Sequence, residues 1–85
     1  MSSMKVTGRQ VKAARGLLDL SQEDLCAATG VSLGTISNFE NGRKVPKEET
    51  VEAIRSSLER RGIIFANGDK PSVTLDPSKA IIPPT

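Results

Sequence analysis

The sequence predicts a mainly α-helical domain of four short helices, with five as the alternative, followed by a C-terminal β-hairpin. Three observations indicate this fold class. Apolar residues recur at helical spacing through most of the chain before Gly62. Residues that favour helix N-termini and left-handed C-termini separate these stretches from one another. Beyond Gly62 the pattern changes to two short apolar runs around a turn, which is typical of strands.

Length and composition limit what the chain can do. Its 85 residues suffice for one small domain, and such domains often depend on association for stability. The start, MSSMKVTGRQ, lacks the apolar stretch of a secretory signal, and no apolar run approaches the length of a membrane span, so we expect a cytoplasmic protein. One cysteine and no histidine exclude an internal disulfide, leave no plausible zinc site and remove the commonest general base. We therefore expect no enzyme activity, no cofactor and no small-molecule ligand.

The pattern divides the chain into four segments. We expect a flexible arm over residues 1–6, a helical domain over 7–62, a hairpin over 63–76 and a tail over 77–85. The end of the chain, DPSKAIIPPT, contains three prolines and has no clear period. Its Ile81-Ile82 pair is either incidental or a docking element for a partner.

The first helix is predicted to start near Gly8 and to run to about Leu18. Thr7 and Gln10 have the spacing of a capping box at its start. Gly16 weakens this helix by roughly 1 kcal/mol relative to alanine, so we expect close packing or an early end there. The inner face is formed by Val11, Ala14 and Leu18. The turn that follows can cap the core with Leu17 and Leu20.

Two short helices joined by a tight turn come next. We expect them over residues 21–29 and 32–39. Ser21 is a good N-cap, and Asp24 stands at the spacing of a reciprocal cap. Gly30 follows where a left-handed residue ends the helix and redirects the chain. Ser32 is a second N-cap, and small polar side chains occupy the free face of the helix that it begins.

The fourth helix follows the loop NGRKVPK, in which Asn41-Gly42 is a turn signal and Pro46 helps to set the helix start. Acidic residues then fall in the first turn of the helix, while Arg60 and Arg61 fall in the last, which suits the helix dipole. Gly62 is a natural stop. The apolar stripe of this helix consists of Val51, Ile54 and Leu58.

The runs IIFA and VTL flank the turn NGDKPS and predict two short strands. A two-stranded hairpin is marginal alone in water, so it must pack on the helices or pair with another chain. We expect it to supply or support a dimer contact. The reasons are its unpaired strand edges and the exposure expected for Ile63, Ile64 and Phe65 beside a domain too small to cover them.

The stretch SQEDLCAATGVSLGTISNFENG resembles the helix-turn-helix of the Cro and lambda-repressor type, also called the xenobiotic-response-element type of transcriptional regulator. The resemblance extends from about Val11 to Val51 and requires about eight residue types at fixed offsets. It implies a compact lambda-repressor-like DNA-binding domain. The residues that carry it are Ser21, Gln22, Leu25, Gly30, Val31, Ile36, Phe39, Glu40, Asn41 and Gly42.

Two residues depart from the family's pattern. Cys26 stands where alanine is usual, and Thr29 stands where an aliphatic residue is usual. The Thr29 hydroxyl needs a partner if it is buried. A redox role for Cys26 is the alternative to a small core residue, but no basic neighbour in sequence would lower its pKa, so we favour the core residue.

The resemblance also implies which residues contact DNA. At the start of the second helix, Gln22 would meet a phosphate. On the third helix Asn38 can pair with adenine, Leu33 can touch a thymine methyl, and Gly34 allows close approach. The other positions that face the groove are Ser32 and Ser37. The remaining phosphate contacts are expected from Thr35, Asn41, Arg43 and Lys44. For each residue the alternative is a solvated surface position.

The family further implies an ion pair between Arg15 and Glu40. It would be partly buried and would orient the third helix against the first rather than add much stability. Removal of one partner strands a charge, which typically costs about 3–5 kcal/mol when the pair is fully buried.

Charge is distributed unevenly, with a net charge of +3 over residues 1–47 and −1 over the remainder. The positive part surrounds the helix-turn-helix, where phosphates would lie. We expect a sequence-specific regulator of double-stranded DNA, most simply a repressor that binds a palindromic operator as a homodimer. An antitoxin-like or controller-like autoregulator would look the same. The alternative is a protein-binding adaptor that uses this fold without DNA contact, and it would lack a steep dependence on salt.

Overall fold

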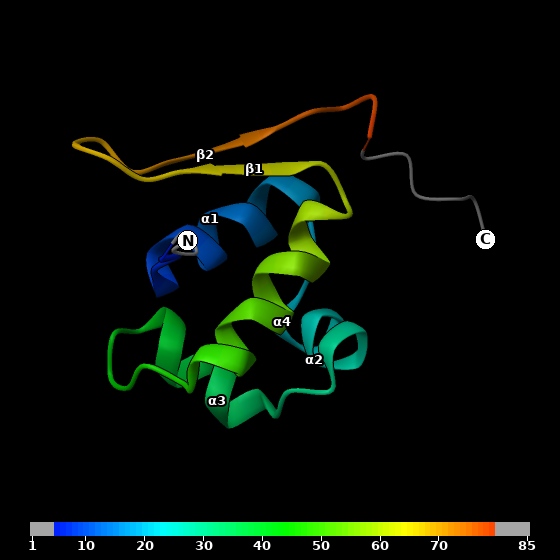
Figure 1. The fold of residues 1–85 in the computed structure, drawn as a ribbon. Helices are drawn as coiled ribbons and strands as arrows, with labels where there is room; N and C mark the ends of the chain where they lie inside the picture. Colours follow the sequence, from blue (N-terminus) through cyan, green and yellow to red (C-terminus); the bar gives the residue numbers. More distant parts are fainter. Residues whose placement is uncertain (1–4, 80–85) are drawn as a thin grey trace.

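The computed structural model describes residues 5–79 and shows a helical body covered at one end by a hairpin (Figure 1). The elements are α1 (Gly8–Leu18), α2 (Gln22–Thr29), α3 (Leu33–Glu40), α4 (Glu48–Glu59), β1 (Ile63–Ala66) and β2 (Ser72–Leu75). The strands are antiparallel, and Ile64 lies opposite Thr74. The mainly helical fold with a C-terminal hairpin is confirmed, and residues 5–79 contain four helices rather than five. None of these helices is long and apolar enough to cross a membrane.

The helix ends follow from local side-chain chemistry. The Thr7 hydroxyl accepts a hydrogen bond from the Gln10 N–H, and the Gln10 Oε1 accepts one from the Thr7 N–H at 3.0 Å. Ser21 and Asp24 form the same reciprocal box at the start of α2. This helix ends at Gly30, which has a φ of 76°. The capping predictions are therefore confirmed. Each cap supplies a hydrogen-bond partner to backbone groups that have none within the helix.

The core draws on the N-terminal segment, all four helices and β1. Its buried apolar members are Val6, Val11, Ala14, Leu25, Ile36, Phe39, Ile54, Leu58, Ile63 and Phe65. β1 packs against α4, and β2 packs against α1, so the hairpin closes this core. In Figure 1 the hairpin and α3 lie at opposite ends of the molecule, with α1 and α4 between them.

Burial of Ile63 and Phe65 corrects the expectation that the apolar residues of the hairpin are exposed. These side chains are 2% and 3% exposed, whereas Ile64, which alternates with them, is 52% exposed. Successive side chains of a strand point to opposite faces, so only one face of β1 can reach the core. The hairpin is therefore part of the folded domain, and its outward face carries Ile64.

The flexible arm expected over residues 1–6 does not extend as far as Val6. Val6 is 6% exposed and belongs to the core, while residues 1–4 lie outside the described part of the chain. Leu17 was expected to cap the core, but it is 47% exposed, and only Leu20 packs against the core. The tail residues 80–85, including Ile81-Ile82, also lie outside the described part.

Two expectations about helix interiors and ends are wrong. Gly16 was expected to mark close packing or an early end, yet it is exposed, no atom lies within 4 Å of the position a Cβ would take, and α1 continues to Leu18. Arg60 and Arg61 were placed in the last turn of the fourth helix. α4 ends two residues before Arg61, at Glu59, so that Arg60 is its C-cap and Arg61 lies in the following turn.

Candidate nucleic-acid interface

The first turn of α3 presents its side chains to solvent. Ile36 and Phe39 hold the other side of the helix in the core, and Leu33 and Gly34 in the first turn are exposed. Leu33 is 43% exposed, and within residues 5–79 no atom outside the neighbouring residues and backbone of α3 lies within 4 Å of the position a Cβ would take at Gly34. A large apolar side chain beside a bare stretch of backbone makes a surface that another molecule can approach closely.

The hydroxyl groups of Ser32 and Thr35, at the start of α3, form a hydrogen bond with each other. The Ser32 hydroxyl accepts a hydrogen bond from the Thr35 N–H at 3.2 Å and donates one to the Thr35 Oγ1 at 2.9 Å. The predicted N-cap is thus present. The capping role constrains both side chains, but a hydroxyl oxygen has two lone pairs and keeps capacity for a further partner.

Asn38 lies near the end of α3 and is half-buried. Its carbonyl accepts hydrogen bonds from the N–H groups of Arg43 at 2.8 Å and Lys44 at 3.4 Å. Within residues 5–79 its side-chain amide forms no hydrogen bond, whereas the half-buried Ser37 accepts one from the Asn41 side chain at 3.4 Å. The Asn38 amide therefore retains its donors and its acceptor for an external partner.

The loop after α3 turns back at Gly42, whose φ of 74° is in the left-handed region. The turn and the two hydrogen bonds to the Asn38 carbonyl hold Arg43 and Lys44 beside the end of α3, and both side chains are exposed. Asn41 is exposed as well. The structure therefore brings the predicted cations to the edge of the α3 surface.

Gln22 contacts the end of α3 rather than standing free at the start of α2. Its side-chain Nε2 donates to the Glu40 carboxylate at 3.1 Å, and the residue is half-buried. An amide nitrogen has two N–H groups, so one remains for a phosphate. The sequence reading missed this contact, because residues 18 positions apart are brought together only by the turn between α2 and α3.

The ion pair expected between Arg15 and Glu40 is present in the structure. The Arg15 Nε and Nη2 donate to the two carboxylate oxygens at 2.7 and 2.8 Å, and Nη1 donates to the Leu20 carbonyl at 2.8 Å. The Glu40 side chain is only 1% exposed, against 15% for Arg15. Because the guanidinium neutralises the carboxylate, the buried charge beside α3 does not repel an approaching anion.

This geometry shifts the titration of both groups. Burial raises the pKa of the Glu40 carboxyl, but hydrogen bonds from Arg15 and Gln22 outweigh it, and the pKa lies below its ordinary value. The hydrogen bond from Glu40 raises the pKa of Arg15. Both groups are therefore charged near neutral pH, and the pair fixes the end of α3 against α1.

The two departures from the family's pattern fit the fold. The Thr29 hydroxyl donates to the Leu25 carbonyl at 2.7 Å and accepts from the Val31 N–H at 3.2 Å. The partners that this hydroxyl was expected to need are thus supplied by α2 and by the turn that follows it. Cys26 is partly buried and packs against the core, as expected of a small core residue.

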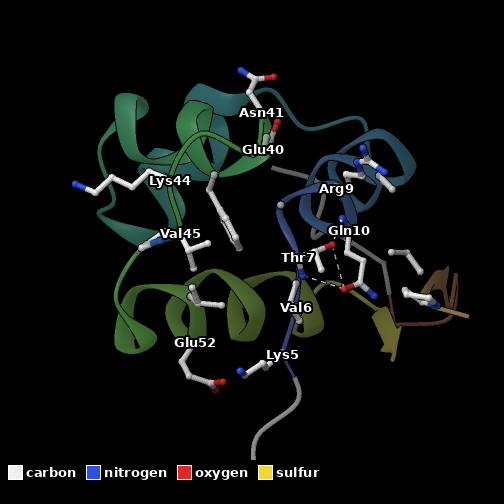
Figure 2. A pocket seen from close by; sticks show the side chains of 18 of the residues that line it. Lys5, Val6, Thr7, Arg9, Gln10, Glu40, Asn41, Lys44, Val45 and Glu52 are labelled. Carbon is white, nitrogen blue, oxygen red and sulfur yellow. Dashed lines mark hydrogen bonds between the residues drawn. The ribbon is translucent and has the colours of Figure 1, made fainter. Parts of the chain in front are cut away.

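A groove borders the N-terminal segment at Val6 and Thr7, between the start of α1, α4 and the start of β2 (Figure 2). Of the predicted DNA-contacting residues, only Asn41 and Lys44 line it. The outward residues of α3 lie outside this groove.

A model of the helix-turn-helix family matches residues 11–61, which is more than half of the chain. The match begins within α1 and ends just after α4. A search of curated proteins found no match.

Proposed function

The chain belongs to the helix-turn-helix family of the Cro and lambda-repressor type, whose members are DNA-binding transcriptional regulators, and from this premise we propose that it is a repressor that binds a palindromic operator as a homodimer. The observation that carries the proposal is the exposed start of α3, together with two exposed cations beside the end of the same helix. The proposal includes a protein that represses its own operon, as antitoxins and controller proteins do. The family is one of regulators and not of enzymes.

In this proposal α3 lies in the major groove and reads base edges. Asn38 is the principal reader, because its unoccupied amide can pair bidentately with adenine. Leu33 packs on a thymine methyl, and Gly34 lets the backbone approach the bases. Ser32 and Ser37 face the same groove and contribute little sequence specificity, since a hydroxyl group can pair with several base edges.

Phosphate contacts fix the register of α3 in the groove. Arg43 and Lys44 stand at the end of α3 and supply positive charge. Neutral contacts come from Gln22, Thr35 and Asn41. The N-terminus of α2 adds backbone N–H groups and the positive end of a helix dipole near Gln22. These contacts position the protein and carry no sequence information themselves.

The homodimer is proposed to form through the outer edge of β2, which pairs with no other strand within residues 5–79. Asp76 donates its backbone N–H to the Gly62 carbonyl. In an antiparallel pair the N–H groups of successive residues point alternately toward and away from the partner strand, so those of Val73 and Leu75 point away from β1. An uncovered edge can pair with an identical one. A two-fold axis perpendicular to the resulting sheet keeps both helical bodies on one side, so both α3 helices face the same DNA.

Two matched substitutions test this interface. Thr74→Lys places like charges opposite each other across a β2–β2 edge, whereas Ile64→Lys alters the outward face of the hairpin on the other strand. Sedimentation velocity should show that Thr74→Lys lowers the dimer fraction and that Ile64→Lys does not. The reverse result would assign the contact to the hairpin face. A truncation at Gly62 cannot serve as the test, because it removes buried Ile63 and Phe65 from the core.

The function itself is tested by selection from random DNA duplexes. The expected result is an enriched palindrome with half-sites about 10–10.5 base pairs apart, centre to centre. Two cations per protomer, Arg43 and Lys44, give four per dimer, so the logarithm of the binding constant should fall with the logarithm of salt with a slope of roughly −3.6. No retention on any duplex at low salt would refute DNA binding and favour the protein-binding adaptor.

A further inference from the structure

We infer that Gln10 is a positioning residue for operator recognition: it fixes the hairpin on α1 and so sets the separation of the two α3 helices in the dimer. This inference rests on the proposed function, because it presumes a dimer joined through β2. It adds a role that the capping box alone does not require.

The Gln10 side chain is shared between a helix cap and the hairpin. Its Oε1 accepts from the Thr7 N–H at 3.0 Å, which completes the capping box (Figure 2). Its Nε2 donates to the Asn67 Oδ1 at 2.8 Å, the Ser72 carbonyl at 3.1 Å and the Ala66 carbonyl at 3.4 Å. The residue is 5% exposed. One amide thus uses its acceptor to hold the start of α1 and its donors to hold both strands.

Asn67, at the turn of the hairpin, extends this connection to the N-terminal segment. Its amide nitrogen donates to the Lys5 carbonyl, while its Oδ1 accepts from Gln10. The N-terminal segment and the hairpin, 62 residues apart at Lys5 and Asn67, therefore meet at these two amides. A buried amide whose donors face carbonyl oxygens is hard to replace, because an unpaired donor or acceptor costs free energy.

The start of α1 is also packed directly on the end of α3. A Cβ built at Gly8 would lie 1.8 Å from the Phe39 carbonyl oxygen, so the two backbones touch where α1 begins. Gln10 is two residues further along the same helix. A rigid path thus runs from β2 through Gln10 and Gly8 to α3. If β2 joins the two protomers, the Gln10 contact determines where each α3 lies relative to the two-fold axis.

The substitution Gln10→Glu separates the two roles of this side chain. A carboxylate oxygen still accepts from the Thr7 N–H, and glutamate is a usual residue at this position of a capping box. The same carboxylate cannot donate to Ser72, Ala66 or Asn67, and it faces their oxygens instead. The variant should keep α1 and α3 in place and release the hairpin end that Gln10 holds.

The experiment uses duplexes with two copies of the half-site enriched by the wild-type chain, separated by the selected spacing or by one base pair more or less. One base pair moves a half-site by about 3.4 Å along the DNA and rotates it by about a tenth of a turn. The wild-type chain should prefer the selected spacing by about tenfold. Gln10→Glu should reduce this preference to about threefold or less, while its affinity for a single half-site stays within about twofold.

Asn67→Asp is the matched control, because it keeps the acceptor for Gln10, loses only the donor to the Lys5 carbonyl and should keep the spacing preference. Asn67→Ala removes that acceptor at an exposed position and should give an intermediate loss. An unchanged preference in Gln10→Glu overturns the inference and leaves the proposed function intact. Equal loss of affinity for single and paired half-sites also overturns it, since Gln10 would then act only on folding. If the wild-type chain enriches no site, the proposed function fails and the inference fails with it.

Discussion

Replacement of Arg15 by methionine should destabilise the protein strongly at neutral pH. The Glu40 side chain is 1% exposed and receives two of its three hydrogen bonds from Arg15. Arg15→Met leaves this carboxylate buried and mostly unpaired, which should cost about 3–5 kcal/mol of the free energy of unfolding. A chain of this size has a total of only about 4–13 kcal/mol, so much of its stability is at stake.

Replacement of the partner, Glu40, by glutamine should lower the free energy of unfolding by less. In Glu40→Gln the Arg15 side chain is 15% exposed and keeps its hydrogen bond to the Leu20 carbonyl, so we expect a loss of about 1.5–3 kcal/mol. The double variant should be more stable than Arg15→Met by at least about 1 kcal/mol, because no buried charge is then left without a partner. Urea denaturation followed by circular dichroism measures all three variants.

The pH dependence provides an independent check of the same reasoning. In the wild-type chain the pKa of Glu40 is lowered, so its contribution is present above the ordinary value of about 4.3 and is lost as pH falls through the folded-state value. Without Arg15, burial should raise that pKa, and the penalty should shrink as pH falls toward about 4. A loss below about 1 kcal/mol at pH 7, or an equal loss at pH 7 and pH 4, would refute the reasoning.

Three further predictions concern recognition and packing. Asn38→Ala should cost about 1–3 kcal/mol of binding free energy and relax the preference at one base position, and a selected site identical to that of the wild type would exclude base reading by Asn38. Arg43→Ala should weaken binding to all duplexes alike and reduce the magnitude of the salt slope by about 2 per dimer in a titration, whereas loss at one sequence only would contradict a phosphate contact. Gly8→Ala should destabilise the protein by about 1–3 kcal/mol or more in urea denaturation, because its Cβ would lie 1.8 Å from the Phe39 carbonyl oxygen. Gly16→Ala should stabilise the protein by about 1 kcal/mol, because no atom beyond its own helix lies within 4 Å of the added Cβ within the described residues.

Most of the predictions that the structure confirms concern interactions between residues close in sequence. The boxes at Thr7 and Ser21 and the left-handed Gly30 involve groups within a few residues of each other, so residue types and spacing determine them. The Arg15–Glu40 pair spans 25 residues and was anticipated only through the resemblance to a family. The DNA-contacting residues stay a prediction, although the structure leaves most of them uncovered.

By itself, the sequence determined the type and approximate bounds of the helices and strands, because these follow from local periodicity and capping, and its residue types at fixed offsets carried the resemblance to the family. Only the tertiary structure decided which side chains of the hairpin are buried and what the Gln10 amide holds. Ile63 and Phe65 reach the core because β1 lies against α4, and Gln10 meets Ser72 across 62 positions of sequence. Contacts of this kind depend on the path of the whole chain, and no local pattern of residues specifies them.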